Sequence, residues 1–90
     1  MNNFNIEQVR YGYVVTMYNK SNVKHSLAGN IAEYLKVTIK EFSKAVELYN
    51  GFYMMQRFGN NYVCFKSKED ANKFITDYLE PLQVINSIDK

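Results

Sequence analysis

The segment 31–46, IAEYLKVTIKEFSKAV, carries start signals for two helices. Asn30 and Glu33 have the spacing of a capping box, and Thr38 and Glu41 repeat that spacing further along the chain. Thr38 also follows a valine, and two consecutive β-branched residues fit poorly inside a helix. We therefore predict two short helices that are joined by a turn near position 37.

The same segment also allows one long helix. Its apolar side chains recur at intervals of three and four residues, which would place them on a single helical face. These residues are Ile31, Leu35, Ile39, Phe42, Val46 and Tyr49. An uninterrupted helix from 30 to 49 is therefore the alternative.

Residues 31–38 resemble the first helix and turn of bacterial helix-turn-helix repressors. In that family a small residue, here Ala32, lets the two helices approach, and a Val-Ser/Thr pair leads into the recognition helix. The similarity covers 16 of the 90 residues, 31–46, with Lys36 where the family usually has glycine. It implies that Phe42 and Val46 face the core. It also implies a set of residues that face the major groove of DNA, namely Lys40, Ser43, Lys44 and Glu47.

Length and composition predict a single domain, residues 1–90. A chain of this size can bury roughly 60–70% of its unfolded surface without metals or disulfides. The single cysteine, Cys64, cannot form an internal disulfide, and no apolar run reaches the length of a membrane span. We therefore expect a cytoplasmic protein with no membrane partner. The abundance of Asn, Lys, Ile and Tyr is typical of an AT-rich genome such as that of a bacteriophage.

The net charge of +2 is small, but it is unevenly distributed along the chain. Residues 1–50 contain six basic and four acidic residues, whereas residues 51–90 contain five of each. The excess comes from lysines on both sides of the predicted helical pair, namely Lys20, Lys24, Lys36, Lys40 and Lys44. This distribution favours an anionic partner, although a solvated face balanced by nearby glutamates is the simpler interpretation.

Local patterns predict the remaining elements. Apolar residues alternate from Val9 to Met17, Asn50 precedes a glycine that suits a helix end, Ser67 has capping-box spacing, and Pro81 should stop a helix. The expected order is a strand at 9–17, helical sequence at about 26–49, a strand at 52–58, a turn at 59–61, a strand at 62–66, a helix at 68–80 and a short strand or tail at 82–88.

These elements predict an α+β fold, a small single domain of strand, two helices, β-hairpin and helix with an optional last strand. In a winged-helix-like version, the hairpin at 52–66 would be the wing. In the alternative, a ferredoxin-like βαββαβ sheet, 26–49 would be one helix and 82–88 the fourth strand. Residues 59–71 also resemble the third strand and second helix of RNA-recognition motifs, which implies that Tyr62 stacks on bases.

The sequence contains no pattern typical of catalysis. His25 is the only histidine, and one histidine with one cysteine is too few ligands for a zinc site. Cys64 is expected to be a small buried residue on a strand. We therefore expect a protein that is not an enzyme and has no metal or cofactor.

The leading hypothesis is a small, non-enzymatic nucleic-acid-binding regulator, with DNA favoured over RNA. The proposed contact residues are Lys36, Lys40, Ser43, Lys44, Lys20, Lys24 and Arg57. The alternative is a protein-binding module that modulates or inhibits a host enzyme, because Tyr, Phe and Met side chains dominate protein interfaces. A homodimer would be consistent with the helix-turn-helix resemblance.

Overall fold

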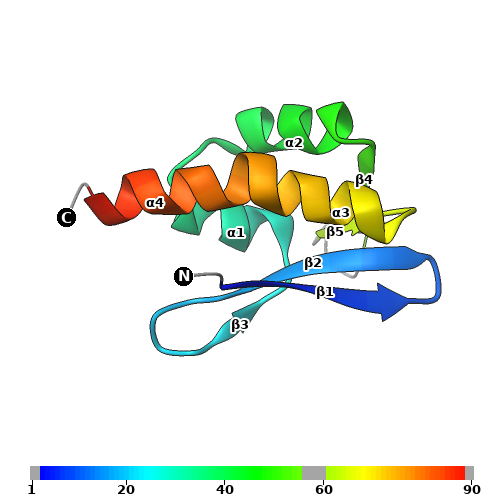
Figure 1. Cartoon of the computed structure of the whole chain (residues 1–90), viewed down its shortest axis with the longest axis horizontal. Helices are drawn as coiled ribbons and strands as arrows, with labels where there is room; N and C mark the ends of the chain where they lie inside the picture. The colour runs from blue at the N-terminus through cyan, green and yellow to red at the C-terminus, as the bar shows by residue number, and fades with distance from the viewer. Residues whose placement is uncertain (1–2, 56–60, 89–90) are drawn as a thin grey trace.

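One antiparallel sheet and a layer of helices on one of its faces make up this computed structural model, which describes residues 3–55 and 61–88. The elements are β1 (Phe4–Val9), β2 (Gly12–Tyr18), β3 (Lys24–His25), α1 (Ala28–Tyr34), α2 (Ile39–Leu48), β4 (Gly51–Met55), β5 (Asn61–Phe65), α3 (Lys68–Phe74), the π-helical segment η2 (Ile75–Leu79) and α4 (Glu80–Ile88). Four strands lie in the order β1-β2-β5-β4, and β3 pairs with the end of β2. Figure 1 shows the helices together on one side of the sheet. The expected α+β class is confirmed.

The core lies between the sheet and the helices, and aromatic rings fill its centre. Val15, Met17, Val63 and Phe65 point from the sheet toward the helices and are fully buried. From the helices, Phe74 lies against four other rings, with centroid distances of 5.2–5.8 Å. This ring cluster accounts for part of the high aromatic content and orients α2 and α3 on the sheet.

The predicted break near position 37 is confirmed, because α1 and α2 are separate helices. Lys36 has a φ of 60°, in the left-handed region. Its N–H donates to the Glu33 carbonyl, and the N–H of Val37 donates to the Ala32 carbonyl. This pair of bonds is the Schellman pattern that ends many helices. The single uninterrupted helix from 30 to 49 is therefore wrong.

One of the two predicted start signals is confirmed. Thr38 accepts a hydrogen bond from the Glu41 N–H at 3.1 Å, and the Glu41 carboxylate accepts one from the Thr38 N–H at 3.2 Å. The start at Asn30 is wrong, since Leu27 is the N-cap of α1. Leu27 forms a β-bridge with Tyr62, so the chain enters the helix directly from the sheet. This non-local pairing overrides the local capping signal.

The strand predicted at 9–17 is confirmed only from Gly12, where β2 begins. Its predicted start is wrong, because Val9 ends a separate strand, β1, which forms a hairpin with β2. The chain turns between Val9 and Gly12, where Gly12 has a φ of 144°. A Cβ at Gly12 would come within 2.4 Å of the Phe65 carbonyl oxygen, so glycine is needed there. The turn could not be seen in the sequence, because the alternation of apolar residues continues through it. Two of those apolar residues are in fact exposed, Val9 to 38% and Tyr11 to 61%.

The second hairpin agrees with the prediction where the structure describes it. β4 and β5 are antiparallel, with Phe52 opposite Cys64 and Met54 opposite Tyr62. The pairing also settles the register, because Tyr53 faces the helices and bonds to α2. The predicted turn lies at 59–61, and residues 56–60 are outside the described part of the chain.

The C-terminal segment contradicts one further prediction. Ser67 caps α3 as expected, accepting from the Asp70 N–H at 3.1 Å. Pro81, however, does not stop the helix, which continues through η2 into α4. In the π-helical turn, the N–H of Glu80 donates to the carbonyl of Ile75, five residues earlier. A wider turn of this kind relieves the clash that a proline ring causes in a regular α-helix.

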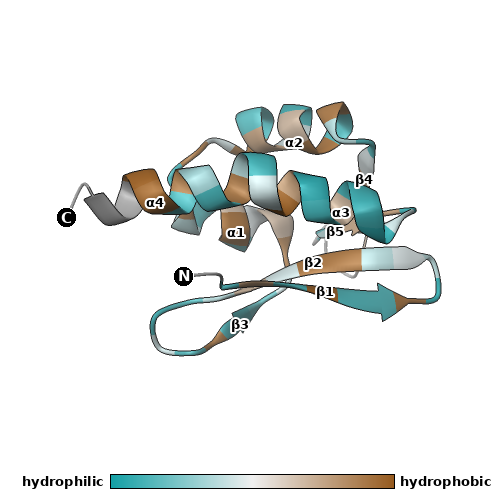
Figure 2. Ribbon diagram, viewed as in Figure 1, coloured by the Kyte–Doolittle hydropathy of each residue, from teal (hydrophilic) through white to brown (hydrophobic). Residues whose placement is uncertain are grey.

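Because 82–88 is helical, the ferredoxin-like alternative with a fourth strand there is wrong. Figure 2 shows an apolar band on α4, in the part of the helix that extends past the sheet in this view. Among the described residues, no helix is both long enough and apolar enough to cross a membrane.

Candidate nucleic-acid interface

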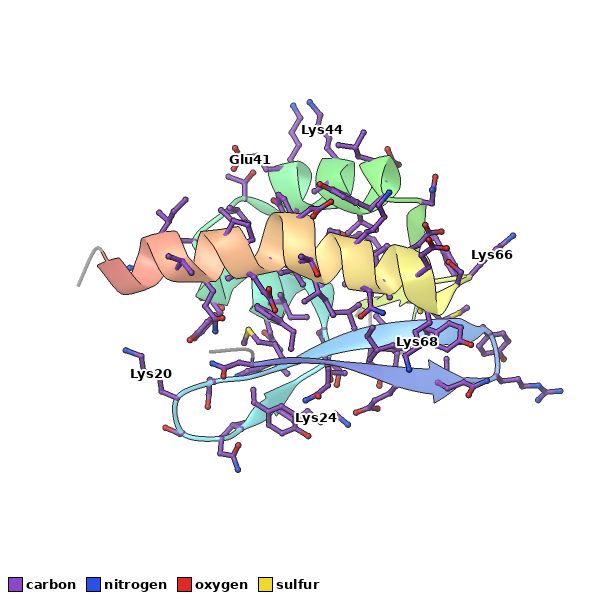
Figure 3. The ribbon with its side chains drawn as sticks, viewed as in Figure 1. Lys20, Lys24, Glu41, Lys44, Lys66 and Lys68 are labelled. Carbon is purple, nitrogen blue, oxygen red and sulfur yellow. The ribbon has the colours of Figure 1, made fainter. Side chains whose placement is uncertain are left out.

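The predicted contact residues on the helical pair are exposed, with one exception. Lys36 lies in the turn, and Lys40 and Lys44 lie on the outer surface of α2. Figure 3 shows Lys44 pointing away from the rest of the molecule. Ser43 is half-buried, and its hydroxyl forms a 2.7 Å hydrogen bond with the hydroxyl of Tyr53. This bond ties α2 to the edge strand β4, so the Ser43 side chain already has a structural partner.

The remaining predicted residues lie elsewhere. Lys20 is in the turn between β2 and β3, and Lys24 is on β3. In Figure 3 both lie on the β3 side of the molecule, opposite to Lys44. Arg57 lies outside the described residues. The structure therefore divides the predicted set between two sides and does not bring it to one surface.

The outer surface of α2 carries little net charge. Lys40 and Lys44 share it with Glu41 and Glu47, all four being exposed. The most exposed apolar side chain on this surface is Leu48, of which 78% is accessible to solvent. Two cations balanced by two carboxylates on one helix give only a weak attraction for a polyanion.

Charge is instead separated between the two layers of the fold. We define the sheet layer as residues 3–27, 51–55 and 61–66, and the helical layer as residues 28–50 and 67–88. The charged residues of the sheet layer are Arg10, Lys20, Lys24, Lys66 and Glu7. Four basic residues and one acidic residue give this layer +3. The helical layer has five basic and seven acidic residues, which give −2.

One face of the sheet is not covered by any of the described helices (Figure 1). Directly paired residues of antiparallel strands point to the same face. Glu7 pairs with Val14, Val14 with Cys64, and Cys64 with Phe52. These residues therefore form one row across four strands on the side away from the core.

A second row lies beside the first on this face. It contains the paired residues Asn5 and Thr16, and the paired residues Tyr62 and Met54. We call the two rows the open sheet face; its members are Asn5, Glu7, Val14, Thr16, Phe52, Met54, Tyr62 and Cys64. Uncovered faces of antiparallel sheets are usually polar. This one is mainly apolar, with Phe52, Met54 and Tyr62 half-buried and Val14 only 5% exposed.

The centre of the open sheet face contains two buried groups of different character. Cys64 is fully buried, as predicted for this strand position, and burial raises the pKa of its thiol. The thiol is therefore neutral near pH 7. Thr16 is only 1% exposed, and its Oγ1 has no hydrogen-bond partner among the described residues. Such an unpaired buried hydroxyl is costly, so it stands out in a sheet that is otherwise well bonded.

A cation borders the open sheet face. Lys24 forms an ion pair with Glu7. The pKa of Lys24 is raised, mainly by its hydrogen bond to the Glu7 carboxylate, with smaller contributions from nearby Tyr18 and Tyr62. Lys24 lies opposite Tyr18 in the β2–β3 pairing, and Glu7 neutralises part of its charge.

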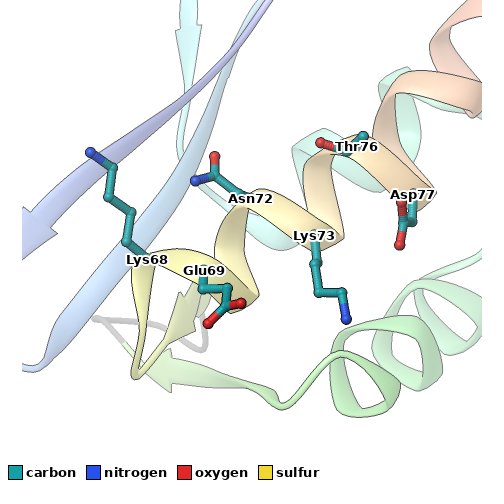
Figure 4. Close-up of a pocket in the computed structure, with 6 residues that line it drawn as sticks. All are labelled: Lys68, Glu69, Asn72, Lys73, Thr76 and Asp77. Atoms are coloured by element: carbon teal, nitrogen blue, oxygen red, sulfur yellow. The ribbon is translucent and has the colours of Figure 1, made fainter.

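A shallow depression runs along the outer surface of α3 and η2 (Figure 4). The residues that line it are Lys68, Glu69, Asn72, Lys73, Thr76 and Asp77. All six are exposed, and their two lysines are matched by two carboxylates. In Figure 4, Lys68 and Lys73 point toward different sides of the helix. This depression has neither the enclosure nor the converging polar groups of a ligand site.

Sequence patterns did not identify the open sheet face as a unit. Tyr62 was singled out, but only through a family resemblance. The run 13–18 carries a usable signal, because apolar residues stand at both its odd-numbered and its even-numbered positions. In a strand, this pattern indicates that both faces are at least partly apolar.

Among the residues that the structure describes, no three His, Cys, Asp or Glu side chains gather where they could hold a metal ion. Comparisons of the chain with protein-family models, with curated proteins and with solved structures found no match.

Proposed function

We propose that this chain is a small, non-enzymatic nucleic-acid-binding protein, and that its sheet layer carries the interface. The observation that supports the proposal best is the separation of charge, with +3 on the sheet layer and −2 on the helical layer. A bound polyanion is attracted to the first layer and repelled by the second, which orients the protein. A regulatory role in the cytoplasm is part of this proposal.

The proposed interface differs from the one that the helix-turn-helix resemblance suggests. On α2 the exposed lysines are balanced by glutamates, and the hydroxyl of Ser43 is bonded to Tyr53. The sheet layer, in contrast, has a net charge of +3 and carries Lys24, paired with its single carboxylate among the described residues, beside an apolar face on which bases can lie. We therefore favour the sheet layer and keep α2 as a competing interface for the experiment.

Two matched double variants separate the interfaces. Lys20→Gln with Lys24→Gln removes two charges from the sheet layer, and Lys40→Gln with Lys44→Gln removes two from α2. Binding of labelled oligonucleotides is measured by fluorescence anisotropy at several salt concentrations. Each lost phosphate contact lowers the slope of log affinity against log salt by roughly 0.7–0.9. We expect the first variant to lose affinity and slope, and the second to resemble the wild type.

Other outcomes overturn parts of the proposal. A loss of slope only in the α2 variant would move the interface back to the helix-turn-helix-like segment. If the wild-type protein binds neither DNA nor RNA at low salt, the nucleic-acid proposal fails.

A second candidate function is that of a protein-binding module acting on a host enzyme. Exposed apolar side chains on the helical layer favour it, since such residues often mark protein interfaces. They are Ile39, Leu48, Val84 and Ile85, each more than half exposed. Retention of a stoichiometric protein partner after nuclease treatment and high salt, lost in a Leu48→Lys variant, would support this candidate over the first.

A further inference from the structure

We infer that the open sheet face binds a single-stranded segment of nucleic acid, with unpaired bases lying against Tyr62 and Phe52. This inference rests on the proposed function and narrows its ligand from nucleic acid in general to an unpaired strand. Three features of the described residues support it: the apolar surface, the position of the cations and the unpaired hydroxyl of Thr16.

The first feature is the chemistry of the surface. A duplex hides the faces of its bases in the stack and presents phosphates and base edges. The half-buried side chains of Phe52, Met54 and Tyr62 carry no charge and no paired hydrogen-bond donors that could recognise phosphates or base edges. Unpaired bases, however, present π-faces, and stacking on aromatic rings is favourable for every base. The apolar character of the face therefore selects for an unpaired strand.

The second feature is where the basic residues lie. Lys24 borders the open sheet face, where it forms an ion pair with Glu7 and lies opposite Tyr18. Lys20 and Lys66 lie at opposite ends of the sheet layer in Figure 3. Lys24 thus places a cation at the border of the apolar face. A strand that crosses this face can place its bases on the apolar side chains and a phosphate near Lys24.

The third feature is the hydroxyl of Thr16. It lies in the second row of the open sheet face, is almost fully buried and has no partner among the described residues. A small shift of neighbouring side chains would let this hydroxyl bond to a base edge, since base edges carry both donors and acceptors. A hydrogen bond to the ligand would supply the missing partner.

Tyr62 provides the direct test. We compare Tyr62→Leu, which keeps apolar bulk but removes the π-face, with Tyr62→Phe, which keeps the ring. The probes are labelled oligothymidylate, oligouridylate and a hairpin duplex, each of about 12 nucleotides, within the ~4–16 that one OB-fold domain covers on a single strand. Circular dichroism and urea unfolding establish that each variant is folded.

We expect the wild type to bind the single strands at least tenfold more tightly than the duplex. The Tyr62→Leu variant should lose about tenfold in single-strand affinity, in line with the loss of one stacked base. The Tyr62→Phe variant should stay within about twofold of the wild type. The ratio between oligothymidylate and oligouridylate shows whether DNA or RNA is the natural ligand.

A second variant, Thr16→Val, tests the hydroxyl. Removing an unpaired buried hydroxyl should leave the protein as stable as before or more stable. If the hydroxyl contacts the ligand, the same variant binds single strands more weakly. Thr76→Val, on the exposed surface of η2, is the control and should change neither property.

The outcomes separate the two proposals. Equal affinity for duplex and single strand, or an unchanged affinity in the Tyr62→Leu variant, overturns the inference and leaves the proposed function standing. Failure to bind any of the three probes at low salt overturns both. In that case, a protein partner retained through the open sheet face would account for its apolar character.

Discussion

At the scale of single residues, the turn between α1 and α2 shows what local sequence can predict. The capping residues Thr38 and Ser67 were identified correctly, because a cap depends on atoms only three residues apart. Asn50, which was predicted to end α2, also has a positive φ, of 66°. The burial of Thr16 and Cys64 could not be predicted from residues nearby in the sequence. It depends on strands that are far apart in the chain and come together only in the sheet.

Lys36 leads to a prediction about stability. Its φ of 60° is a conformation that costs L-residues roughly 1–2 kcal/mol and that glycine adopts freely. Lys36→Gly should therefore raise the free energy of unfolding by about 0.5–1 kcal/mol, after allowing for the greater freedom of glycine in the unfolded chain. Urea unfolding followed by circular dichroism measures the change.

The control for this prediction is Lys44→Gly, inside α2, which should lower the free energy of unfolding by about 1 kcal/mol. Both variants remove one exposed lysine, so any general effect of charge is the same in the two. A destabilised Lys36→Gly variant would contradict the assignment of a strained left-handed turn.

At the scale of elements, hairpins and helix ends were predicted with different success. The β4–β5 hairpin was recognised because two segments with strand-like composition flank a Gly-Asn-Asn sequence that is typical of turns. The β1–β2 hairpin was missed because Tyr11 continues the apolar alternation through the turn. The end of the helix at Pro81 was also wrong, because the rule assumes regular α-helical geometry and the chain uses a π-helical turn instead.

Pro81 gives the prediction that belongs to this scale. Pro81→Ala supplies an N–H donor and removes the ring that a regular helix excludes. We expect η2 to tighten toward α-helical geometry, and the amides of residues 82–85 to exchange with solvent more slowly. Hydrogen exchange followed by NMR measures this protection.

Pro81→Gly is the matched control, since it also restores the donor but lowers helix propensity by about 1 kcal/mol. Its amides at 82–85 should gain less protection than those of Pro81→Ala. If α4 frays in the alanine variant, Pro81 is not the cause of the π-helical turn.

At the scale of the whole molecule, the chain order conceals the distribution of charge. By sequence, the first 50 residues carry the whole excess of +2, which pointed to the helical pair. In the fold, the sheet layer takes strands from both halves of the chain and holds four basic residues with one carboxylate, whereas the helical layer holds five basic residues with seven carboxylates. The α+β class was predictable from periodicity. The interface was not, because it depends on which strands become neighbours.

Glu7 offers a whole-molecule test of this charge separation. Among the described residues, it is the one carboxylate of the sheet layer, and it is paired with Lys24. Glu7→Gln should raise the net charge of the sheet layer from +3 to +4, and it should leave Lys24 free to contact a phosphate. We expect single-strand affinity to rise several-fold at 0.1 M salt, and the salt slope to steepen by about 0.7, as for one added phosphate contact.

The control for Glu7→Gln is Glu69→Gln, because it changes the net charge of the protein by the same amount on the helical layer. If only total charge mattered, both variants would gain equally. Because a bound strand is screened from charges more than about 10 Å away at 0.1 M salt, the exposed carboxylate on the helical layer should have little effect. Equal gains in anisotropy titrations would show that the sheet layer is not the binding surface, whereas a gain confined to Glu7→Gln would locate the phosphates beside Lys24.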